Sequence, residues 1–510
     1  MSGVTPRIER PPSRVVIVGG GPGGYEAALV ARRGGADVVV VERKGLGGNA
    51  VLTDVVPSKT LIATAEWMRQ ADSGPELGIR HIGEGGPEPV RTGLSVDLGA
   101  VNARVLTLAA AQSADIRSRL EREGVRIIEG TARLDGPLRV VVSPAQPADD
   151  GPSVADAVAP PSQESVADAV APPSQEPAAD VVLEADVVLL SVGSRPRELD
   201  SAKPDGERIL RWDQLYALDE LPSRLIVVGS GVTGAEFAGA YHALGCDVVL
   251  VSSRDQVLPG EDPDAAAVIQ EVFMTQGMTV LSRSRASAAR RTADGVVVEL
   301  ADGRSIEGSL VLMAVGSVPA TQGLGLEEAG VILSPSGHIE VDRVSRTSAR
   351  GVYAAGDCTG VFPLASVAAT QGRIAMAHAL GDAVAPLKLE TIASTVFTQP
   401  EIATVGRSQS WLDERGIRYV STTLELARNP RAKMHGIRDG FVKLFAHATS
   451  GEVLGGVVVA PRASELILPV ALAVAQRLTV DEVADTATIY PSLTGSIAET
   501  ARMLHDAGSH

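Results

Sequence analysis

The sequence predicts an α/β protein in which two strand–helix–strand units are followed by a smaller α+β segment. Two observations carry this prediction. A β-branched run, RVVIV from Arg14, leads through GGGPGG into a helical pattern and a second strand, ADVVVVE. The same order recurs later as RLIVVG, SGVTGAEFAGAYHALG and CDVVLVS. Such alternation is typical of parallel sheets with right-handed crossovers.

The C-terminal segment, after about residue 390, shows a different pattern. We expect strands at STVFT, FVKLFA and VLGGVVVA, and one strongly apolar helix at ASELILPVALAVAQRL. Its apolar surface is too large for a solvated face, so we expect a partner subunit to cover it.

Composition narrows the classes of function. The 510 residues predict about three or four domains. Two cysteines, Cys246 and Cys358, are too few for a disulfide framework or a cysteine-rich metal site, and their number suits a reducing compartment. A net charge of −16 argues against nucleic acid as the main partner. Because no apolar run is long enough for a membrane span or a signal peptide, we expect a cytoplasmic protein.

One internal stretch differs from the rest. Ser153–Glu164 and Ser165–Glu176 are identical copies of SVADAVAPPSQE, rich in proline, alanine and acidic residues. This composition predicts a disordered insert over 145–180 that arose by tandem duplication. Strand patterns on either side, LRVVVS and DVVLEADVVLLSVG, indicate that the insert extends a β-hairpin.

The first glycine turn has the spacing G-x-G-x-x-G. Gly19, Gly21 and Gly24 directly follow the first strand, and Glu42 ends the next one. Such glycines permit a tight turn and a close approach of the backbone to a pyrophosphate, while the carboxylate is placed to accept hydrogen bonds from ribose hydroxyls. The combination predicts dinucleotide binding.

The second glycine turn, formed by Gly229, Gly231 and Gly234, ends differently. Ser252 stands where a ribose-binding carboxylate is expected, and Arg254 follows it. No carboxylate is present there to repel a 2′-phosphate, and Arg254 has the chemistry to bind one. We predict that NADPH is at least tolerated. The alternative is that Arg254 is only a solvated loop cation.

Two dinucleotide folds in one chain suggest hydride transfer between two cofactors. Together with further motifs in the same order, they resemble the flavoprotein disulfide reductases, the pyridine nucleotide-disulfide oxidoreductase family. The further motifs are GLGG at Gly45–Gly48, PSK at Pro57–Lys59, AVG at Ala314–Gly316, YAAGD at Tyr353–Asp357 and VFTQPE at Val396–Glu401.

This resemblance implies a homodimer that uses FAD and NAD(P)H. It implies an extension at 1–13, an FAD domain at 14–198, an NAD(P) domain at 199–322, a central segment at 323–390 and an interface domain at 391–510. Asp357 matches an acid that binds the ribityl chain of FAD, and Ala365 opens a helix facing the flavin pyrimidine. Gly130 matches a contact to the adenine side of FAD, and Gly48 and Gly316 lie in cofactor-binding turns.

Lys59 and Glu236 match the pair that the family places beside flavin N5. A lysine there draws electron density from the ring, and a glutamate fixes the lysine and orients the nicotinamide. Outside the family, Lys59 would be read as a surface cation and Glu236 as a helix-face carboxylate.

The chain departs from the family at its thiols. Aligned on the PSK motif, the two redox cysteines are replaced by Ala50 and Val55, and the catalytic histidine and its glutamate are replaced by Tyr490 and Gly495. No dithiol reaction is possible without these groups, so we expect no reduction of lipoamide or glutathione.

The reduced flavin then needs an acceptor that takes electrons from the ring itself, and a flat quinone qualifies. Tyr490, from a partner subunit, would donate a hydrogen bond to a quinone oxygen or simply pack. The pattern is similar to actinobacterial lipoamide-dehydrogenase-like NAD(P)H quinone reductases. The alternatives are a diaphorase or transhydrogenase-like flavoenzyme and a non-catalytic FAD-binding protein. We expect Cys246 and Cys358 to be small, buried, hydrophobic residues.

Overall fold

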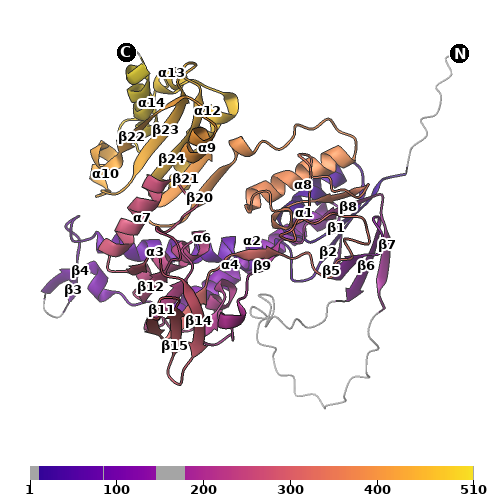
Figure 1. Cartoon of the computed structure of the whole chain (residues 1–510), viewed down its shortest axis with the longest axis horizontal. Coiled ribbons are helices and arrows are strands. Elements are labelled where there is room, and N and C mark those ends of the chain that lie inside the picture. Colours follow the sequence, from indigo (N-terminus) through magenta and orange to yellow (C-terminus); the bar gives the residue numbers. More distant parts are fainter. Residues whose placement is uncertain (1–10, 84–85, 145–178, 509–510) are drawn as a thin grey trace. The chain divides into compact units, whose positions relative to one another are not determined.

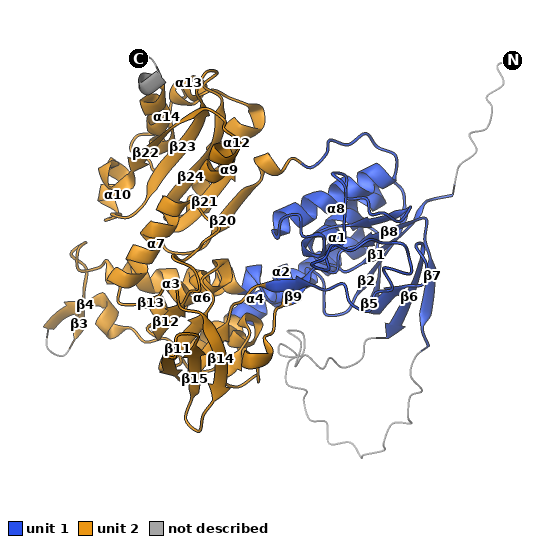
Figure 2. Ribbon diagram, viewed as in Figure 1, with its two compact units in different colours: residues 1–57, 105–195, 317–387 blue, residues 58–104, 196–316, 388–510 orange. Residues whose placement is uncertain are grey.

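Two units, each with a parallel sheet of its own, make up the chain (Figure 2). The computed structural model describes residues 11–83, 86–144 and 179–508. Unit 1 comprises residues 1–57, 105–195 and 317–387, and unit 2 comprises residues 58–104, 196–316 and 388–510. Most of the predicted extension at 1–13 and of the predicted insert at 145–180 lies outside the described residues.

Unit 1 is built on a seven-stranded sheet of order β19-β8-β1-β2-β5-β6-β7. Its strands are β1 (Arg14–Val18), β2 (Asp37–Glu42), β5 (Arg126–Leu134), β6 (Arg139–Pro144), β7 (Val181–Glu184), β8 (Val187–Leu190) and β19 (Val352–Ala354). The first five strands of this order run parallel. Strand order reverses between β1 and β8, which is where doubly wound sheets bind ligands. The antiparallel pairing of β6 with β7 confirms the predicted hairpin strands.

Helices α1 and α8 cover one face of this sheet (Figure 1). They pack closely, because Gly372 of α8 lies against the backbone of Gly23 of α1. The helices with residues in unit 1 are α1 (Pro22–Arg33), α2 (Gly48–Leu52), α8 (Ala365–Ala379), and parts of α3 (Val55–Asp72) and α4 (Leu98–Arg122), in which the unit boundary falls. A short ladder joins β9 (Ser194–Pro196) to β18 (Ser317–Pro319).

Unit 2 contains a second parallel sheet, of order β10-β17-β11-β12-β13. Its elements are β10 (Ile209–Leu210), β11 (Arg224–Val228), α6 (Val232–Leu244), β12 (Asp247–Val251), α7 (Pro263–Thr275), β13 (Thr279–Leu281) and β17 (Leu310–Met313). Antiparallel additions are β3 (Arg80–Gly83) with β4 (Gly86–Pro89), and β14 (Ala286–Arg291) with β15 (Val296–Leu300) and β16 (Ser305–Gly308). Both predicted strand–helix–strand units are therefore present.

The C-terminal part of unit 2 is an antiparallel sheet of order β20-β21-β24-β23-β22. Its elements are β20 (Ala393–Val396), β21 (Glu401–Gly406), α9 (Gln409–Glu414), β22 (Tyr419–Glu425), α10 (Pro430–Met434), β23 (Phe441–His447), β24 (Val453–Ala460), α13 (Val480–Ala484) and α14 (Gly495–Gly508). Short 3₁₀ turns are η1 (Val90–Gly93), η2 (Asp200–Ala202), η3 (Trp212–Ala217), η4 (Asp357–Thr359), η5 (Leu389–Thr391) and η6 (Leu426–Arg428). The three strands expected here are confirmed.

The prediction of one apolar helix after β24 was wrong. The segment forms two helices, α11 (Ala463–Leu466) and α12 (Leu468–Gln476), because Pro469 has no N–H to continue the hydrogen-bond ladder. Leu468 and Leu472 are 60% and 52% exposed, so this segment does present an apolar face. Among the described helices, none has both the length and the hydropathy that a bilayer crossing needs.

A buried ion-pair cluster connects α7 to the C-terminal sheet within unit 2. Lys443 Nζ on β23 lies 3.0 Å from Asp262 Oδ2 and 2.7 Å from Asp264 Oδ2. The side chains of Lys443 and Asp262 are 6% and 5% exposed. Burial alone lowers the pKa of Lys443, but its hydrogen bonds to Asp264 and Asp262 outweigh burial and raise that pKa. The lysine therefore stays charged inside the unit.

We expect Lys443→Met to lower the free energy of unfolding by about 3 kcal/mol, because it leaves the Asp262 carboxylate buried without its cation. Arg477→Ala is the matched control, since Arg477 is 77% exposed in its pair with Glu452 and such pairs contribute less than about 1 kcal/mol. Urea unfolding of both variants measures the difference. Equal effects would contradict the structural role given to Lys443.

Candidate active site

The first glycine turn lies at the carboxyl end of β1. Gly19 has φ +98°, and any Cβ there would collide with the carbonyl of Ser191. Gly24 packs its Cα against the Gly19 carbonyl, while Gly48 has φ +57° and lies against Gly21. These contacts require glycine.

Gly21 differs from its neighbours in having open space where a Cβ would point. It is the N-cap of α1, and no side chain caps that helix. The first N–H groups of α1 are thus left for an anionic group, and a small residue lets that group come close. The turn therefore fits the pyrophosphate of a dinucleotide.

Glu42 ends β2 beside this turn. Its Oε2 accepts a 2.6 Å hydrogen bond from Gly20 N, and its Oε1 accepts bonds from Arg43 N and Lys44 N at 2.7 and 2.8 Å. A carboxylate offers about four acceptor positions, so Oε2 retains room for a further donor. The carboxylate both shapes the turn and remains available to a ribose hydroxyl.

Asp357 lies at the same end of the sheet, directly after β19. Its Oδ2 accepts a 2.8 Å hydrogen bond from Ser194 Oγ, and Ser194 O accepts one of 2.7 Å from Asn49 Nδ2 on α2. Burial raises the pKa of Asp357, although the Ser194 hydroxyl opposes the shift. A hydroxyl-rich ligand chain would satisfy the remaining oxygen of this half-buried carboxyl group.

Two other predicted contacts in unit 1 have simple structural settings. Ala365 opens α8, whose N-terminus also has no side-chain cap, so its first N–H groups are available to an electronegative group. Gly130 on β5 is buried, and a Cβ there would press against Ser143 of β6. Strand packing thus explains Gly130 by itself, and its contact with a cofactor stays a prediction.

The second glycine turn, in unit 2, repeats the first. Gly229 has φ +110° and lies against the Ala314 carbonyl, and Gly234 packs on Gly229. Gly231 is the uncapped N-cap of α6 and again has open space at its Cβ position. Gly316, with φ +92°, is equally open. A second dinucleotide fits here for the same reasons.

At the end of β12, the structure separates two residues that the sequence grouped together. Ser252 is fully buried, and its Oγ accepts a 2.7 Å hydrogen bond from Ser230 Oγ. Ser252 Oγ also accepts from Arg254 N at 3.1 Å, while the Arg254 side chain is exposed. Ser252 therefore fixes the loop, and Arg254 is the group that a ligand would meet.

Lys59 and Glu236, separated by 177 positions in the chain, meet within unit 2. Lys59 Nζ lies 2.7 Å from Glu236 Oε2. The second oxygen of Glu236, Oε1, accepts a 2.8 Å hydrogen bond from the backbone N of Phe397. Lys59 Nζ also lies 5.0 Å from the centroid of the Phe397 ring, within the range of a cation–π contact. Glu236 is 4% exposed, and each of its two carboxylate oxygens accepts a hydrogen bond.

Sequence reasoning missed the part played by Phe397. The sequence shows the motif VFTQPE, but the group that binds Glu236 is the backbone N–H of Phe397. Every residue except proline has such a group, so the residue type does not reveal the contact. The buried Gln371 was missed too: its Oε1 accepts from Gly356 N at 2.8 Å and so supports the turn before Asp357. The position of Gln371 on α8, facing the sheet, was the only available signal.

Both cysteines are free and buried. Cys358 is fully buried, and its Sγ lies 3.3 Å from the Ala355 carbonyl. Burial raises the pKa of Cys358 to about 12, and it raises the pKa of Cys246 to about 12 as well. The predicted burial of both cysteines is confirmed. Tyr490 is 81% exposed.

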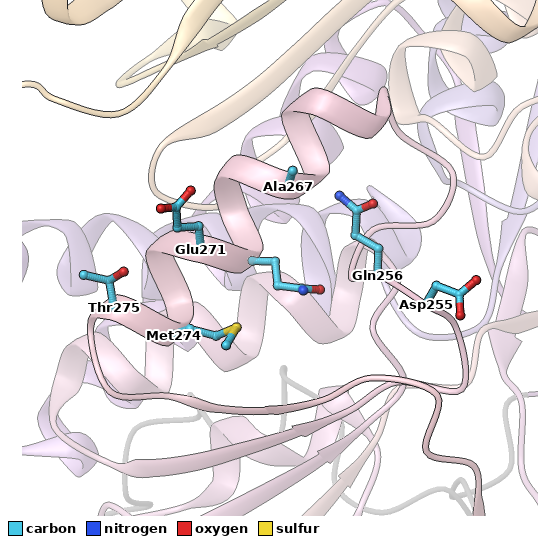
Figure 3. Close-up of a pocket in the computed structure, with 7 residues that line it drawn as sticks. Asp255, Gln256, Ala267, Glu271, Met274 and Thr275 are labelled. Carbon is cyan, nitrogen blue, oxygen red and sulfur yellow. The ribbon is translucent and has the colours of Figure 1, made fainter.

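Two surface pockets are lined neither by the glycines of the two turns nor by Lys59. One, of about 480 Å³, has Asp255 and Gln256 on one side and Ala267, Glu271, Met274 and Thr275 along α7 on the other (Figure 3). The second, of about 790 Å³, is in unit 1 between β5 and the segment after β18. Neither contains a candidate catalytic residue.

A model of the pyridine nucleotide-disulphide oxidoreductase family matches residues 13–372, and the model of that family's dimerisation domain matches residues 392–501. The chain belongs to this family. The predicted resemblance and fold class are thereby confirmed. Pyridine nucleotide-disulphide oxidoreductases use FAD and NAD(P)H, the cofactors that the sequence predicts.

Two named relatives differ in the reaction that their names give. A protein of Mycobacterium tuberculosis named NAD(P)H dehydrogenase (quinone) is 50% identical over 97% of this chain and 94% of its own length. A dihydrolipoyl dehydrogenase of Chlorobaculum parvum is 31% identical over 96% of each chain.

Solved structures agree with the family assignment. The crystal structure of LpdA from Mycobacterium tuberculosis covers 96% of this chain and 99% of its own, with 49% identity and a TM-score of 0.84. The flavoprotein disulfide reductase RclA from Escherichia coli is 20% identical with a TM-score of 0.78, which supports the fold alone.

We expect neither cysteine of this oxidoreductase to react with iodoacetamide in the native protein at pH 8. Only the thiolate is nucleophilic, and with pKa values of about 12 the thiolate is scarce as well as buried. Intact-mass spectrometry counts the labels, with guanidinium-unfolded protein as the control that takes up two. Rapid labelling of folded protein during turnover would contradict this assignment.

Proposed function

We propose that this chain is an FAD-dependent NAD(P)H:quinone oxidoreductase that works without a redox disulfide. The proposal rests on one combination of features. Lys59 and Glu236 form an ion pair, whereas the positions of the two redox cysteines, 50 and 55, hold alanine and valine. The name of the 50% identical relative, NAD(P)H dehydrogenase (quinone), supports the same function.

In this proposal unit 1 holds FAD. The N–H groups that open α1 bind the pyrophosphate, and Glu42 accepts from the adenosine ribose. Asp357 accepts from the ribityl chain, and the N-terminus of α8, beginning at Ala365, stabilises negative charge on the pyrimidine end of the flavin. Bound FAD would supply the capacity to take a hydride and to release electrons one or two at a time.

The nicotinamide dinucleotide is proposed to bind on the second glycine turn. The N–H groups that open α6 bind its pyrophosphate, and Arg254 binds the 2′-phosphate when NADPH is used. Glu236, fixed by the Phe397 N–H, orients the nicotinamide and holds the Lys59 ammonium in place. Because Glu236 is 4% exposed, its charge is screened little by water, which strengthens its hold on the lysine.

The acceptor is proposed to be a quinone. Ala50 and Val55 give the position of the family dithiol an apolar character, which suits an aromatic ring better than a thiol. A homodimer is part of the proposal, because the segment that matches the dimerisation domain carries the exposed Leu468 and Leu472. Tyr490 would then contribute its phenol to the partner's acceptor site.

Stopped-flow absorbance of the FAD-loaded protein tests this function. We expect NADPH or NADH to bleach the flavin quickly and menadione or benzoquinone to restore its colour, with no lipoamide reduction at matched enzyme concentration. Slow bleaching would indicate a non-catalytic FAD protein. Rapid bleaching without reoxidation by quinones would indicate a diaphorase or transhydrogenase-like enzyme.

Lys59→Met and Glu236→Gln separate the two half-reactions. We expect each substitution to slow flavin bleaching by about 100-fold, the usual loss for one preorganised charged group. Reoxidation by menadione should stay within about threefold of wild type, because the pair acts only in the step that reduces the flavin. Lys433→Met, at an exposed lysine of α10, is the matched control. An unchanged bleaching rate in both active-site variants would remove the pair from the mechanism.

A further inference from the structure

The carboxyl ends of β12 and β13 form one continuous surface in unit 2. The two strands pair in parallel, with Val251 opposite Leu281. The loops that follow them are joined by hydrogen bonds: Arg283 N donates to Arg254 O at 2.8 Å, and Ser284 N donates to Ser252 O at 2.7 Å. Arg283 is therefore anchored directly beside Arg254, although 29 positions of chain separate them in the sequence.

Arg283 has an unusual backbone conformation. Its φ is +52°, in the left-handed region that glycine and asparagine occupy far more readily than arginine. Strained backbone positions of this kind cluster at ligand-binding and functional sites. That side chain is 81% exposed.

The charges around this surface favour an anion. Arg254 and Arg283 supply two guanidinium groups, and the position where the first turn has Glu42 is taken by the buried Ser252. Asp255 pairs with Arg283, with Oδ1 3.5 Å from Arg283 Nε and 88% of its side chain exposed. An exposed pair at that distance is weak, so a phosphate dianion would displace the carboxylate and take a two-point contact from the guanidinium.

We propose that Arg283 is a second specificity-determining residue for NADPH, which binds the adenosine 2′-phosphate together with Arg254. Asp255 acts against it, by pairing with Arg283 when no 2′-phosphate is present. This inference rests on the proposed function, because it assigns NAD(P)H to the second glycine turn. It adds a residue that lies outside the G-x-G-x-x-G motif and its following strand.

Calorimetric titration of the FAD-loaded full chain tests the inference without turnover. The probes are 2′,5′-ADP, which carries the 2′-phosphate, and 5′-AMP, which does not. We expect Arg283→Ala to weaken binding of 2′,5′-ADP by about tenfold, the loss of one charge-assisted hydrogen bond, and that of 5′-AMP by less than about twofold. Asp255→Asn should tighten 2′,5′-ADP alone, because it releases Arg283. Arg290→Ala, which removes an exposed arginine of β14 paired with Glu299, is the control.

The outcomes separate this inference from the proposed function. If Arg283→Ala weakens both probes equally, or neither, while wild type still oxidises NAD(P)H, the inference fails and the proposed function stands. If the wild-type protein binds neither probe, the inference fails. If wild type also leaves the flavin oxidised after NADH and NADPH are added, the proposed function fails too. Selective loss of 2′,5′-ADP binding, with folding unchanged by circular dichroism, supports the inference.

Discussion

Three segments of unit 2 that are far apart in the sequence meet at one buried carboxylate. Glu236 on α6 is bound by the Lys59 ammonium from α3 and by the Phe397 N–H at the end of β20. Loss of either partner would leave charge or a hydrogen-bonding group unpaired at a site that water hardly reaches. These contacts therefore hold the three chain segments together, and they also orient the Lys59 ammonium, which we propose takes part in the reaction.

The two glycine turns share one backbone design. In each turn, the first and third glycines are required by close backbone contacts, and the middle glycine leaves open space before an uncapped helix. The difference lies at the end of the next strand, where Glu42 remains polar and accessible while Ser252 is buried by Ser230. The end of β2 has a carboxylate that suits free ribose hydroxyls. At the end of β12, only the surrounding arginines are left to contact a ligand.

Sequence patterns that repeat at fixed spacing were sufficient to predict both parallel sheets and the C-terminal strands, because burial on two faces gives unbroken apolar runs. They also placed Lys59 and Glu236 together, although only through a family resemblance. The hydrogen bond from Phe397 N–H to Glu236 and the burial of Ser252 could not be predicted from the sequence. A backbone N–H and a serine hydroxyl find their partners only through the tertiary fold. The break at Pro469 was readable from the sequence, but the apolar pattern outweighed it.

We propose that electrons reach the acceptor without passing through sulfur. The most direct measurement is the rate at which menadione reoxidises the NADPH-reduced, FAD-loaded Cys246→Ala/Cys358→Ala variant. Both cysteines are small and buried, so alanine preserves packing closely enough for FAD content to serve as the folding check. We expect a rate within about twofold of wild type, since no thiol takes part. A variant that keeps its FAD and is bleached normally but no longer responds to menadione would contradict it.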